Sequence, residues 1–293
     1  MRKSVLFIIS IVFSFLIAVT GTRDVQAAAK WKVTQYAGKS GNQSMFYTIT
    51  DSRGRLCIID GGWRSDAEQV RNIIRKHKNK VHVWIITHPH PDHTGAFNSI
   101  MESGKIKVDK IYTIKVNKKL YKKTAAWYDE YEEFEAFEKI CKKHKKKVTY
   151  FKENDTVDLL GLKMKVFSVW DSSLKKYTHN LCNYGSLVFR VEGKKDSMLF
   201  CSDVEKKVEK KILKKHKKEL YSTYVQCGHH GNWGLSKKFY KYVNAKGAFF
   251  DAPKWITEDH SGTYDAPMMI KFFKKRKTKV FLWKNAPNRV TLR

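Results

Sequence analysis

The segment THPHPDHTG, residues 87–95, places three histidines and an aspartate within six positions. It directly follows the apolar run VHVWII, which predicts that it lies at the end of a buried strand and enters a proline-containing turn. In an extended segment His88 and His90 point the same way and can share one ion. Asp92 and His93 lie just past the bend and can face a second ion. Because imidazole and carboxylate groups suit zinc and similar metals, the segment predicts a metal site.

A two-ion site needs further ligands from other parts of the chain. In the segment SMLFCSDV, Asp203 follows an apolar run. In the segment YVQCGHHGNWG, His229 and His230 follow another apolar run. An aspartate can bridge two ions with its two oxygens, and a histidine at a strand end can complete the second ion. Two such ions activate a water molecule and stabilise charge on a displaced oxygen. This chemistry suits the hydrolysis of an ester, an amide or a phosphodiester.

Strand-like and helix-like patterns alternate after residue 30, which indicates an α/β layered domain. Apolar runs and alternations predict strands at 45–50, 55–60, 81–87, 110–114, 148–151, 162–169, 186–191, 197–201, 221–226, 248–251 and 280–283. Helical spacing of apolar residues predicts helices at 66–78, 127–141, 204–220 and 265–274. We find no internal repeat and no Pro/Ser-rich linker, so we expect a single catalytic domain over residues 31–293.

Together these residues resemble the metallo-β-lactamase fold superfamily, whose motif HxHxDH is filled completely by residues 88–93. The resemblance implies a four-layer αβ/βα sandwich with the site at one edge. It also implies a role for each matching residue. Metal ligands would be His88, His90, Asp92, His93, Asp203 (bridging) and His230; Asp60 would orient the histidine turn, Asp92 would also accept the proton of water, and His229 would protonate the leaving group. The sequence leaves the reverse assignment of His229 and His230 open.

One departure narrows the resemblance. Most members of the superfamily supply another histidine between the HxHxDH turn and the bridging aspartate, but here that region reads THNLCNYGSLVFRV. His179 is present, yet the arrangement around Asn183 resembles a branch with asparagine there. That branch contains the extracellular domain of DNA-uptake competence proteins and the cell-wall phosphorylcholine esterases. Asn183 would then orient substrate or serve only as a turn or strand-start residue. With one histidine fewer, zinc and manganese both remain reasonable as the two divalent ions.

The N-terminal residues resemble a secretory signal. A basic start precedes an apolar run and the small-residue stretch VQAAA, so we expect cleavage near Ala27 and a signal peptide over residues 1–27. The alternative is an uncleaved membrane anchor, for which the apolar run is short. No other apolar run reaches spanning length. We therefore expect a secreted or extracytoplasmic protein with no later transmembrane segment. Its positive charge is the one feature that would hold it at the cell surface.

The formal net charge is +30, which favours anionic partners such as nucleic acid or wall polymers. Solvated lysine faces explain the same composition, because the lysines are spread along the chain. The five cysteines form no CxxC pair, so no disulfide framework is predicted. No feature implies a stable protein partner.

Three functions remain open. The first, which the resemblance, the export signal and the positive charge favour, is a secreted phosphodiesterase or nuclease that acts on DNA or another anionic substrate. The second is a phosphorylcholine-type esterase of wall polymers, for which the aromatic and acidic residues of WYDEYEEFE, 127–135, would form a cage around a quaternary ammonium group. An amphipathic helix with buried aromatic residues and solvated acids explains that segment more simply. The third is a polyanion-binding module without catalysis, which the retained ligands disfavour.

Overall fold

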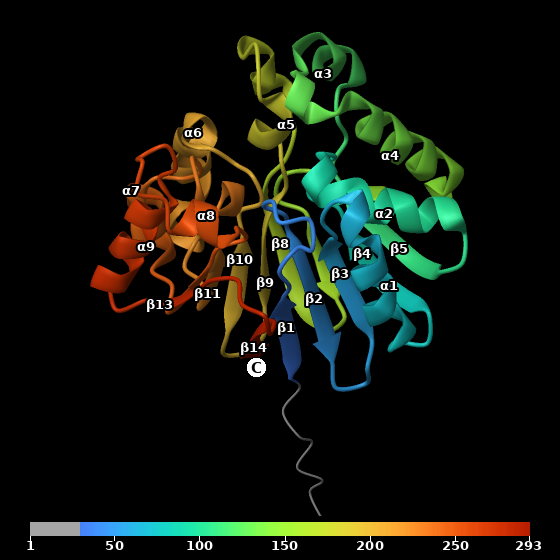
Figure 1. Cartoon of the computed structure of the whole chain (residues 1–293), viewed down its shortest axis with the longest axis horizontal. Helices are drawn as coiled ribbons and strands as arrows, with labels where there is room; N and C mark the ends of the chain where they lie inside the picture. The colour runs from blue at the N-terminus through green and yellow to red at the C-terminus, as the bar shows by residue number, and fades with distance from the viewer. Residues whose placement is uncertain (1–29) are drawn as a thin grey trace, which may run out of the picture.

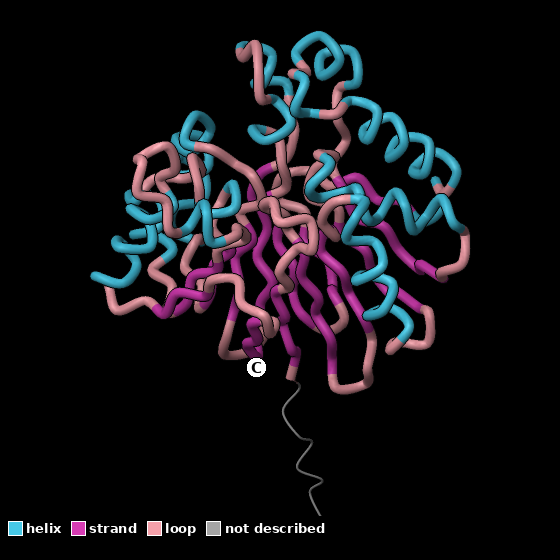
Figure 2. The backbone as a smooth tube through the Cα atoms, viewed as in Figure 1, coloured by secondary structure: helices cyan, strands magenta, loops and turns pink. Residues whose placement is uncertain are grey.

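The computed structural model describes residues 30–293, so the signal peptide expected over residues 1–27 lies outside the described part. Two β-sheets pack face to face in the middle of the molecule, and helices cover their outer faces (Figures 1 and 2). This arrangement is the four-layer αβ/βα sandwich that the sequence predicts. The C-terminus lies near the start of β1, at the end of the sandwich away from α3 and α5 (Figure 1).

The first sheet has the strand order β14-β1-β2-β3-β4-β5-β6. Its strands β3, β4, β5 and β6 run parallel, whereas β14, β1, β2 and β3 pair antiparallel. The bounds are β1 Trp31–Gln35, β2 Phe46–Asp51, β3 Leu56–Asp60, β4 Lys80–Ile85, β5 Lys107–Thr113, β6 Val148–Tyr150 and β14 Asn288–Leu292.

The second sheet has the order β13-β12-β11-β10-β9-β8-β7. Strands β10 to β13 run parallel, and β7 to β10 pair antiparallel. The bounds are β7 Thr156–Leu159, β8 Leu162–Ser168, β9 Val188–Glu192, β10 Ser197–Phe200, β11 Tyr224–Gln226, β12 Gly247–Phe249 and β13 Lys279–Phe281. In both sheets, the parallel strands therefore bring their carboxyl ends to a common edge.

The helices fall into two outer layers and an upper group (Figure 1). The bounds are α1 Ala67–Arg75, α2 Pro91–Ser103, α3 Lys118–Thr124, α4 Tyr131–Lys143, α5 Leu181–Tyr184, α6 Lys206–His216, α7 Lys237–Val243, α8 Lys254–Thr257 and α9 Ala266–Lys275. Helices α1, α2 and α4 bury apolar side chains such as Val70, Phe97 and Phe137 beside the first sheet. Helices α6, α7 and α9 do the same beside the second.

The core between the sheets is aromatic and aliphatic. Tyr47 of the first sheet packs edge-on against Phe200 of the second, with ring centroids 5.3 Å apart. Asp251, just after β12, accepts hydrogen bonds at 2.7 Å from Tyr47 and Gln35 across the same seam. Burial of this apolar surface is the main force holding the two halves together, and the site lies at its rim.

Every predicted strand is present, with ends within about three residues of those expected. The strands β1, β7 and β14 were not predicted, because their residues are too polar or too few to show a periodic pattern. The helix predicted at 127–141 is wrong at its start: α4 begins at Tyr131, after a 3-10 turn over Trp127–Asp129 and a left-handed Glu130 with φ 41°. Trp127 is 90% exposed, so its expected place on a buried helix face is also wrong.

Among the described residues, no helix is long and apolar enough to cross a membrane. All five cysteines are buried and unpaired.

Candidate metal centre

The HxHxDH segment begins a helix at the carboxyl end of a buried strand. His90 is the N-cap residue of α2, Pro91 fills the first helical position, and Asp92 and His93 lie in the first turn. Proline is pre-organised for that position, and a carboxylate there is stabilised by the helix dipole. Gly95 permits this packing, because a Cβ at that position would collide with the backbone at Trp63 and Arg64. The sequence therefore places two expected ligands on one rigid turn.

Asp60, the last residue of β3, fixes the histidine turn. Its Oδ2 lies 2.7 Å from His93 Nδ1 and accepts a hydrogen bond of 2.7 Å from Thr87 Oγ1. Its Oδ1 accepts a bond of 2.8 Å from the Thr87 backbone N–H. Burial raises the pKa of Asp60, and His93 and Thr87 oppose that rise. This contact directs the other ring nitrogen of His93, Nε2, toward the cluster, as a carboxylate behind a metal-ligating histidine does.

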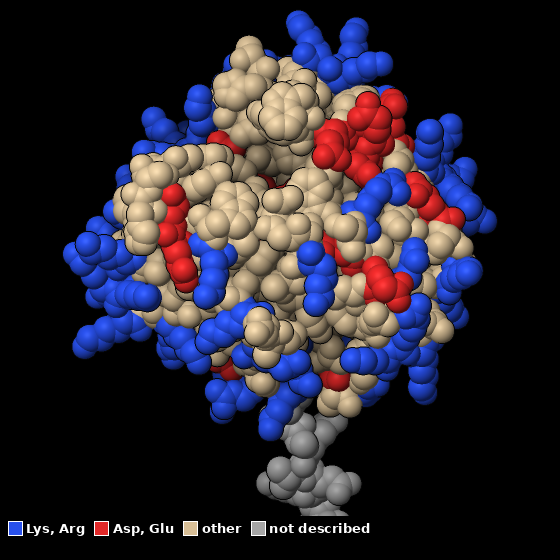
Figure 3. Space-filling model, in the orientation of Figure 1, with Lys and Arg blue, Asp and Glu red and all other residues tan. Residues whose placement is uncertain are grey.

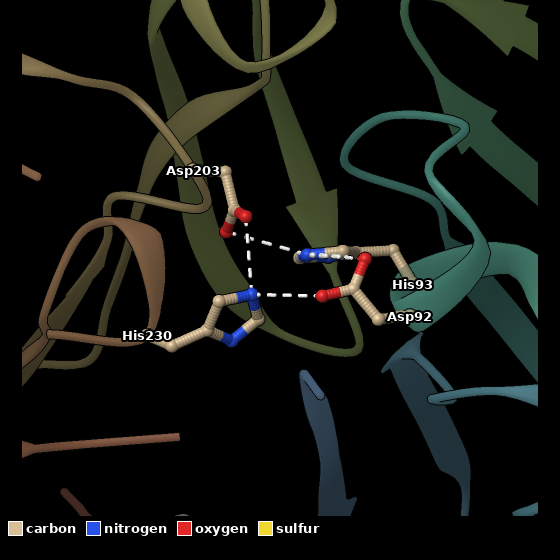
Figure 4. Close-up of side chains that lie close together, drawn as sticks. All are labelled: Asp92, His93, Asp203 and His230. Carbon is tan, nitrogen blue, oxygen red and sulfur yellow. Dashed lines mark ion pairs between the residues drawn. The ribbon is translucent and has the colours of Figure 1, made fainter. Parts of the chain in front are cut away.

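Four buried side chains from both halves of the sandwich meet at the centre. One ligand atom from each of Asp92, His93, Asp203 and His230 lies within 4.8 Å of the other three. Figure 4 shows the four side chains pointing toward one another, with Asp203 and His230 facing Asp92 and His93. His230 Nε2 lies 3.0 Å from Asp92 Oδ2 and 3.1 Å from Asp203 Oδ2. His93 Nε2 lies 3.3 Å from Asp203 Oδ1.

The donor set fits a divalent metal ion. The Nε2 atoms of His93 and His230 and the Oδ1 atom of Asp203 are buried without a hydrogen-bond partner among the described residues. Unpartnered buried polar atoms cost free energy, and a cation satisfies all of them at once. Nitrogen and carboxylate oxygen are the ligands that zinc and related ions prefer.

The electrostatics of the cluster also call for positive charge. Burial lowers the pKa of His93, but Asp203, Asp92 and Asp60 outweigh it and raise that pKa well above its ordinary value. For His230, burial again opposes the rise, yet Asp203 and Asp92 raise the pKa to about 10. Histidines that hold protons so strongly lie where a cation is stabilised.

The remaining expected ligands lie around this cluster. His88 Nε2 is 4.0 Å from Asp203 Oδ2, so His88 approaches the bridging aspartate from the other side. The His88 and His90 rings lie 4.7 Å apart, centroid to centroid. The Nε2 of His90, however, faces the buried Asp129 at 2.6 Å. The structure thus brings His88, Asp92, His93 and His230 to within about 4 Å of Asp203 or of one another. His90, the sixth expected ligand, contacts Asp129, a partner that the sequence did not suggest.

His229 and Asn183 lie beside the cluster. Asn183 is in α5, and its Nδ2 approaches His229 Nε2 at 3.3 Å. His229 Nε2 is 3.9 Å from Asp203 Oδ2, farther than the same atom of His230. Burial lowers the pKa of His229 to about 4. His179, the other histidine of this region, is exposed and is not among the four residues of the cluster.

A cleft with a volume of about 500 Å³ opens onto this site. Its lining residues are Gln43, Trp63, His90, Pro91, Asp92, Tyr128, Asn180, Asn183, Asp203, Glu205, His229 and Trp233. Sequence reasoning missed Trp63, Glu205 and Trp233 here. Glu205 and Trp233 follow the expected ligands Asp203 and His230 within three residues, which is a signal that could have identified them.

The family model "Metallo-beta-lactamase superfamily" matches residues 40–163. Among solved structures, the metallo-beta-lactamase fold protein YhfI from Bacillus subtilis aligns with a TM-score of 0.54 at 11% identity, over 89% of this chain and 99% of that one. The metallo hydrolase Igni18 from Ignicoccus hospitalis gives 0.50 at 13% identity, over 90% and 99%.

A third similar structure is larger. CmlA, a diiron beta-hydroxylase from Streptomyces venezuelae, aligns with a TM-score of 0.55 at 11% identity, over 89% of this chain but 54% of that one. A search of curated protein sequences found no match. At these identities the structures show the fold alone. Together with the family match over residues 40–163, they show that this chain has the metallo-β-lactamase fold.

Proposed function

We propose that this protein is a metal-dependent phosphoric ester hydrolase whose substrate carries a cationic group beside the scissile phosphate, as phosphorylcholine esters do. The observation that carries the proposal is the composition of the cleft over the metal cluster. Three aromatic side chains and the carboxylate of Glu205 line it, and none of the described residues that line it is Lys or Arg. Aromatic faces bind a quaternary ammonium group by cation–π attraction, and a carboxylate adds charge attraction when it is ionised. Burial raises the pKa of Glu205 to about 7, and a bound cation favours its ionised form.

The aromatic walls of this cleft are held in place. Trp63 Nε1 donates a hydrogen bond of 2.8 Å to the Gln43 backbone oxygen. Trp233 Nε1 donates one of 3.2 Å to the Thr263 oxygen, and the Trp233 ring stacks on Tyr264. Tyr128 and Trp233 remain about half exposed. Exposed aromatic side chains fixed around a concave site are typical of ligand binding rather than of core packing.

The charge distribution disfavours nucleic acid at this cleft. Figure 3 shows Lys and Arg side chains gathered around the margins of this face, whereas the hollow in its upper part is bordered mainly by uncharged and acidic side chains. A nucleic-acid site would neutralise several phosphates with Lys or Arg. The proposal therefore prefers the second of the three functions open from the sequence, and assigns the +30 net charge to surfaces outside the cleft.

The cage considered over residues 127–135 is only partly supported. Tyr128 lines the cleft, but Trp127 is outside it and Tyr131 packs against Tyr121. The aromatic wall is instead completed from distant segments by Trp63 and Trp233. Asparagine in place of the usual extra histidine supports phosphoester over lactam chemistry, and Asn183 supports it further by lining the cleft.

When bound, the divalent ions would supply Lewis-acid stabilisation of charge that develops on the phosphoryl group. Burial alone would raise the pKa of Asp92, but His93 and His230 hold it below its ordinary value, so Asp92 is a carboxylate able to accept a proton. The Nδ2 group of Asn183 is placed to donate a hydrogen bond beside His229. We assign leaving-group protonation to His229, which is neutral until an anionic substrate lies against it.

The test is a panel of substrates with the purified protein loaded with zinc or manganese. It includes p-nitrophenyl phosphorylcholine, bis-p-nitrophenyl phosphate and plasmid DNA. Because a partly desolvated cation–π contact contributes about 1–2 kcal/mol, we expect kcat/KM to be about 5–30-fold higher for the choline ester. Equal or better cleavage of the other two substrates would overturn the substrate assignment. DNA binding with no turnover of any ester would favour the non-catalytic module.

A further inference from the structure

We infer that Asp129 is the positioning residue of the metal ligand His90, supplied by a helical segment that also forms part of the cleft. Asp129 lies in the 3-10 turn Trp127–Asp129, between α3 and α4, far in sequence from the HxHxDH turn. Its Oδ1 is 2.6 Å from His90 Nε2. The inference rests on the metal-binding part of the proposed function and is independent of the substrate.

The burial of Asp129 requires a partner. The residue is 1% exposed, and His90 is its only ion-pair partner among residues 30–293. A buried carboxylate without a partner lowers the free energy of unfolding. A protonated His90 Nε2 facing Asp129 offsets that loss. Both facing atoms are buried, and neither makes a hydrogen bond of standard geometry with any described group, so the close contact between them is an ion pair.

The other carboxylate oxygen is already engaged. Asp129 Oδ2 accepts a hydrogen bond of 2.6 Å from the backbone N–H of Ala126, and the Asp129 N–H returns one of 3.1 Å to the Ala126 oxygen. This reciprocal pair fixes the carboxylate plane. Oδ1 is thereby held toward His90 and is not free to turn elsewhere.

The distance separates orientation from direct metal ligation. Two ligands bound to one zinc ion at about 2.0–2.2 Å in tetrahedral geometry lie about 3.3 Å apart. The observed 2.6 Å between His90 Nε2 and Asp129 Oδ1 is too short for two ligands of one ion and suits a direct ion pair between the side chains. Asp129 therefore occupies the Nε2 side of the His90 ring, which leaves Nδ1 as the nitrogen available for an ion. Asp60 has the same relationship to His93, so each half of the ligand turn has its own buried carboxylate.

The segment also connects the metal ligand to the substrate cleft. Tyr128 lines the cleft, while the adjacent Asp129 points to His90. Glu130 follows with a positive φ of 41°, a conformation that non-glycine residues rarely adopt and that turns the chain into α4. One short turn thus holds a cleft wall on one side and a histidine on the other.

The test measures metal affinity directly, by competition with a chromophoric chelator, without substrate. An asparagine has a single acceptor oxygen, so Asp129→Asn cannot serve both Ala126 and His90. We expect one of the binding steps for zinc to weaken by about 10–100-fold. Asp129→Glu keeps a carboxylate and is expected to recover part of the affinity. Cobalt-substituted protein should show a changed absorption spectrum in Asp129→Asn, because the orientation of one ligand changes.

The matched control is Glu133→Gln, one helical turn away. Glu133 is also a buried carboxylate, but it bonds Asn98 and Arg64 and touches no histidine. We expect its metal affinity to stay within about twofold of the parent. Parent-like affinity and spectrum in folded Asp129→Asn, or equal losses in Asp129→Asn and Glu133→Gln, contradict the inference alone. A parent protein that binds no divalent ion contradicts the proposed function as well.

Discussion

Asp60 Oδ2 lies 2.7 Å from His93 Nδ1, and both side chains are fully buried. The same carboxylate receives both hydrogen bonds that Thr87 can donate. One aspartate therefore fixes the direction of the histidine and the backbone of the ligand turn together. This relationship predicts that a residue that is not expected to touch metal is needed for metal binding.

Asp60→Asn should weaken metal binding about 10–100-fold, because the amide can no longer accept from His93 and Thr87 at once. Chelator competition with zinc measures the change. Asp196→Asn is a suitable control, since Asp196 pairs with Arg293 on the surface. Unchanged affinity in Asp60→Asn would show that the turn holds its ligands without the carboxylate.

His229 and His230 should separate by function. His230 Nε2 is 3.0 Å from Asp92, whereas His229 lines the cleft next to Asn183. We expect His230→Ala to lose bound metal, and His229→Ala to keep metal while kcat falls about 10²–10⁴-fold. Metal content by elemental analysis and turnover of one ester decide the question. Metal loss only in His229→Ala would reverse the two roles.

Trp233→Leu should affect cationic substrates selectively. Removal of the ring removes a cation–π contact of about 1–2 kcal/mol but leaves the metal cluster untouched. We expect KM for p-nitrophenyl phosphorylcholine to rise about 5–30-fold, and KM for bis-p-nitrophenyl phosphate to change little. A parallel rise for both substrates would indicate general damage to the cleft.

Metal removal should lower thermal stability. Without a cation, the carboxylates of Asp92 and Asp203 repel each other and several buried ligand atoms lack partners. An ion that binds only the folded state stabilises that state by about 2.7 kcal/mol at a concentration 100 times its Kd. Addition of zinc or manganese to chelator-treated protein should therefore raise Tm. Asp203→Ala should abolish most of that rise. An identical Tm shift in Asp203→Ala would place the stabilising ion elsewhere.

The pH dependence of stability should include the turn between β2 and β3. The Asp51 carboxylate accepts two hydrogen bonds from Arg55, one from the backbone N–H (2.8 Å) and one from Nε (2.7 Å). Burial raises the pKa of Asp51, but these bonds outweigh it and lower the pKa below its ordinary 3.8. Because the folded pKa is depressed, this stabilisation is present above about pH 3.8 and is lost as pH falls through the folded value.

Asp51→Asn should therefore lower the free energy of unfolding by about 1 kcal/mol between pH 5 and 7. Below about pH 3.8 the variant and the parent should converge. Thermal melts of chelator-treated protein measure the difference and avoid a contribution from metal loss. A difference that grows toward low pH would contradict the assignment.

Much of the fold could be predicted from the sequence. Alternation of apolar strands and amphipathic helices predicted the layers, and the match of residues 88–93 to HxHxDH predicted the metallo-β-lactamase fold. The errors concern weakly patterned segments. Edge strands such as β7 bury little surface, so their residues carry no clear periodicity. Trp127 has the residue type of a core position, yet the left-handed Glu130 starts a new helix after it and leaves it exposed.

The sequence by itself determined the type of site, because three histidines and an aspartate on one turn have few uses other than metal binding. It also indicated that Asp203 and the His229–His230 pair belong to the site, since carboxyl ends of parallel strands meet at one edge. Only the tertiary structure decided how the turn is supported and what can enter. Asp129, Trp63 and Trp233 come from segments far apart along the chain. Their meeting depends on the packing of two sheets and an inserted helical turn, which no local pattern encodes.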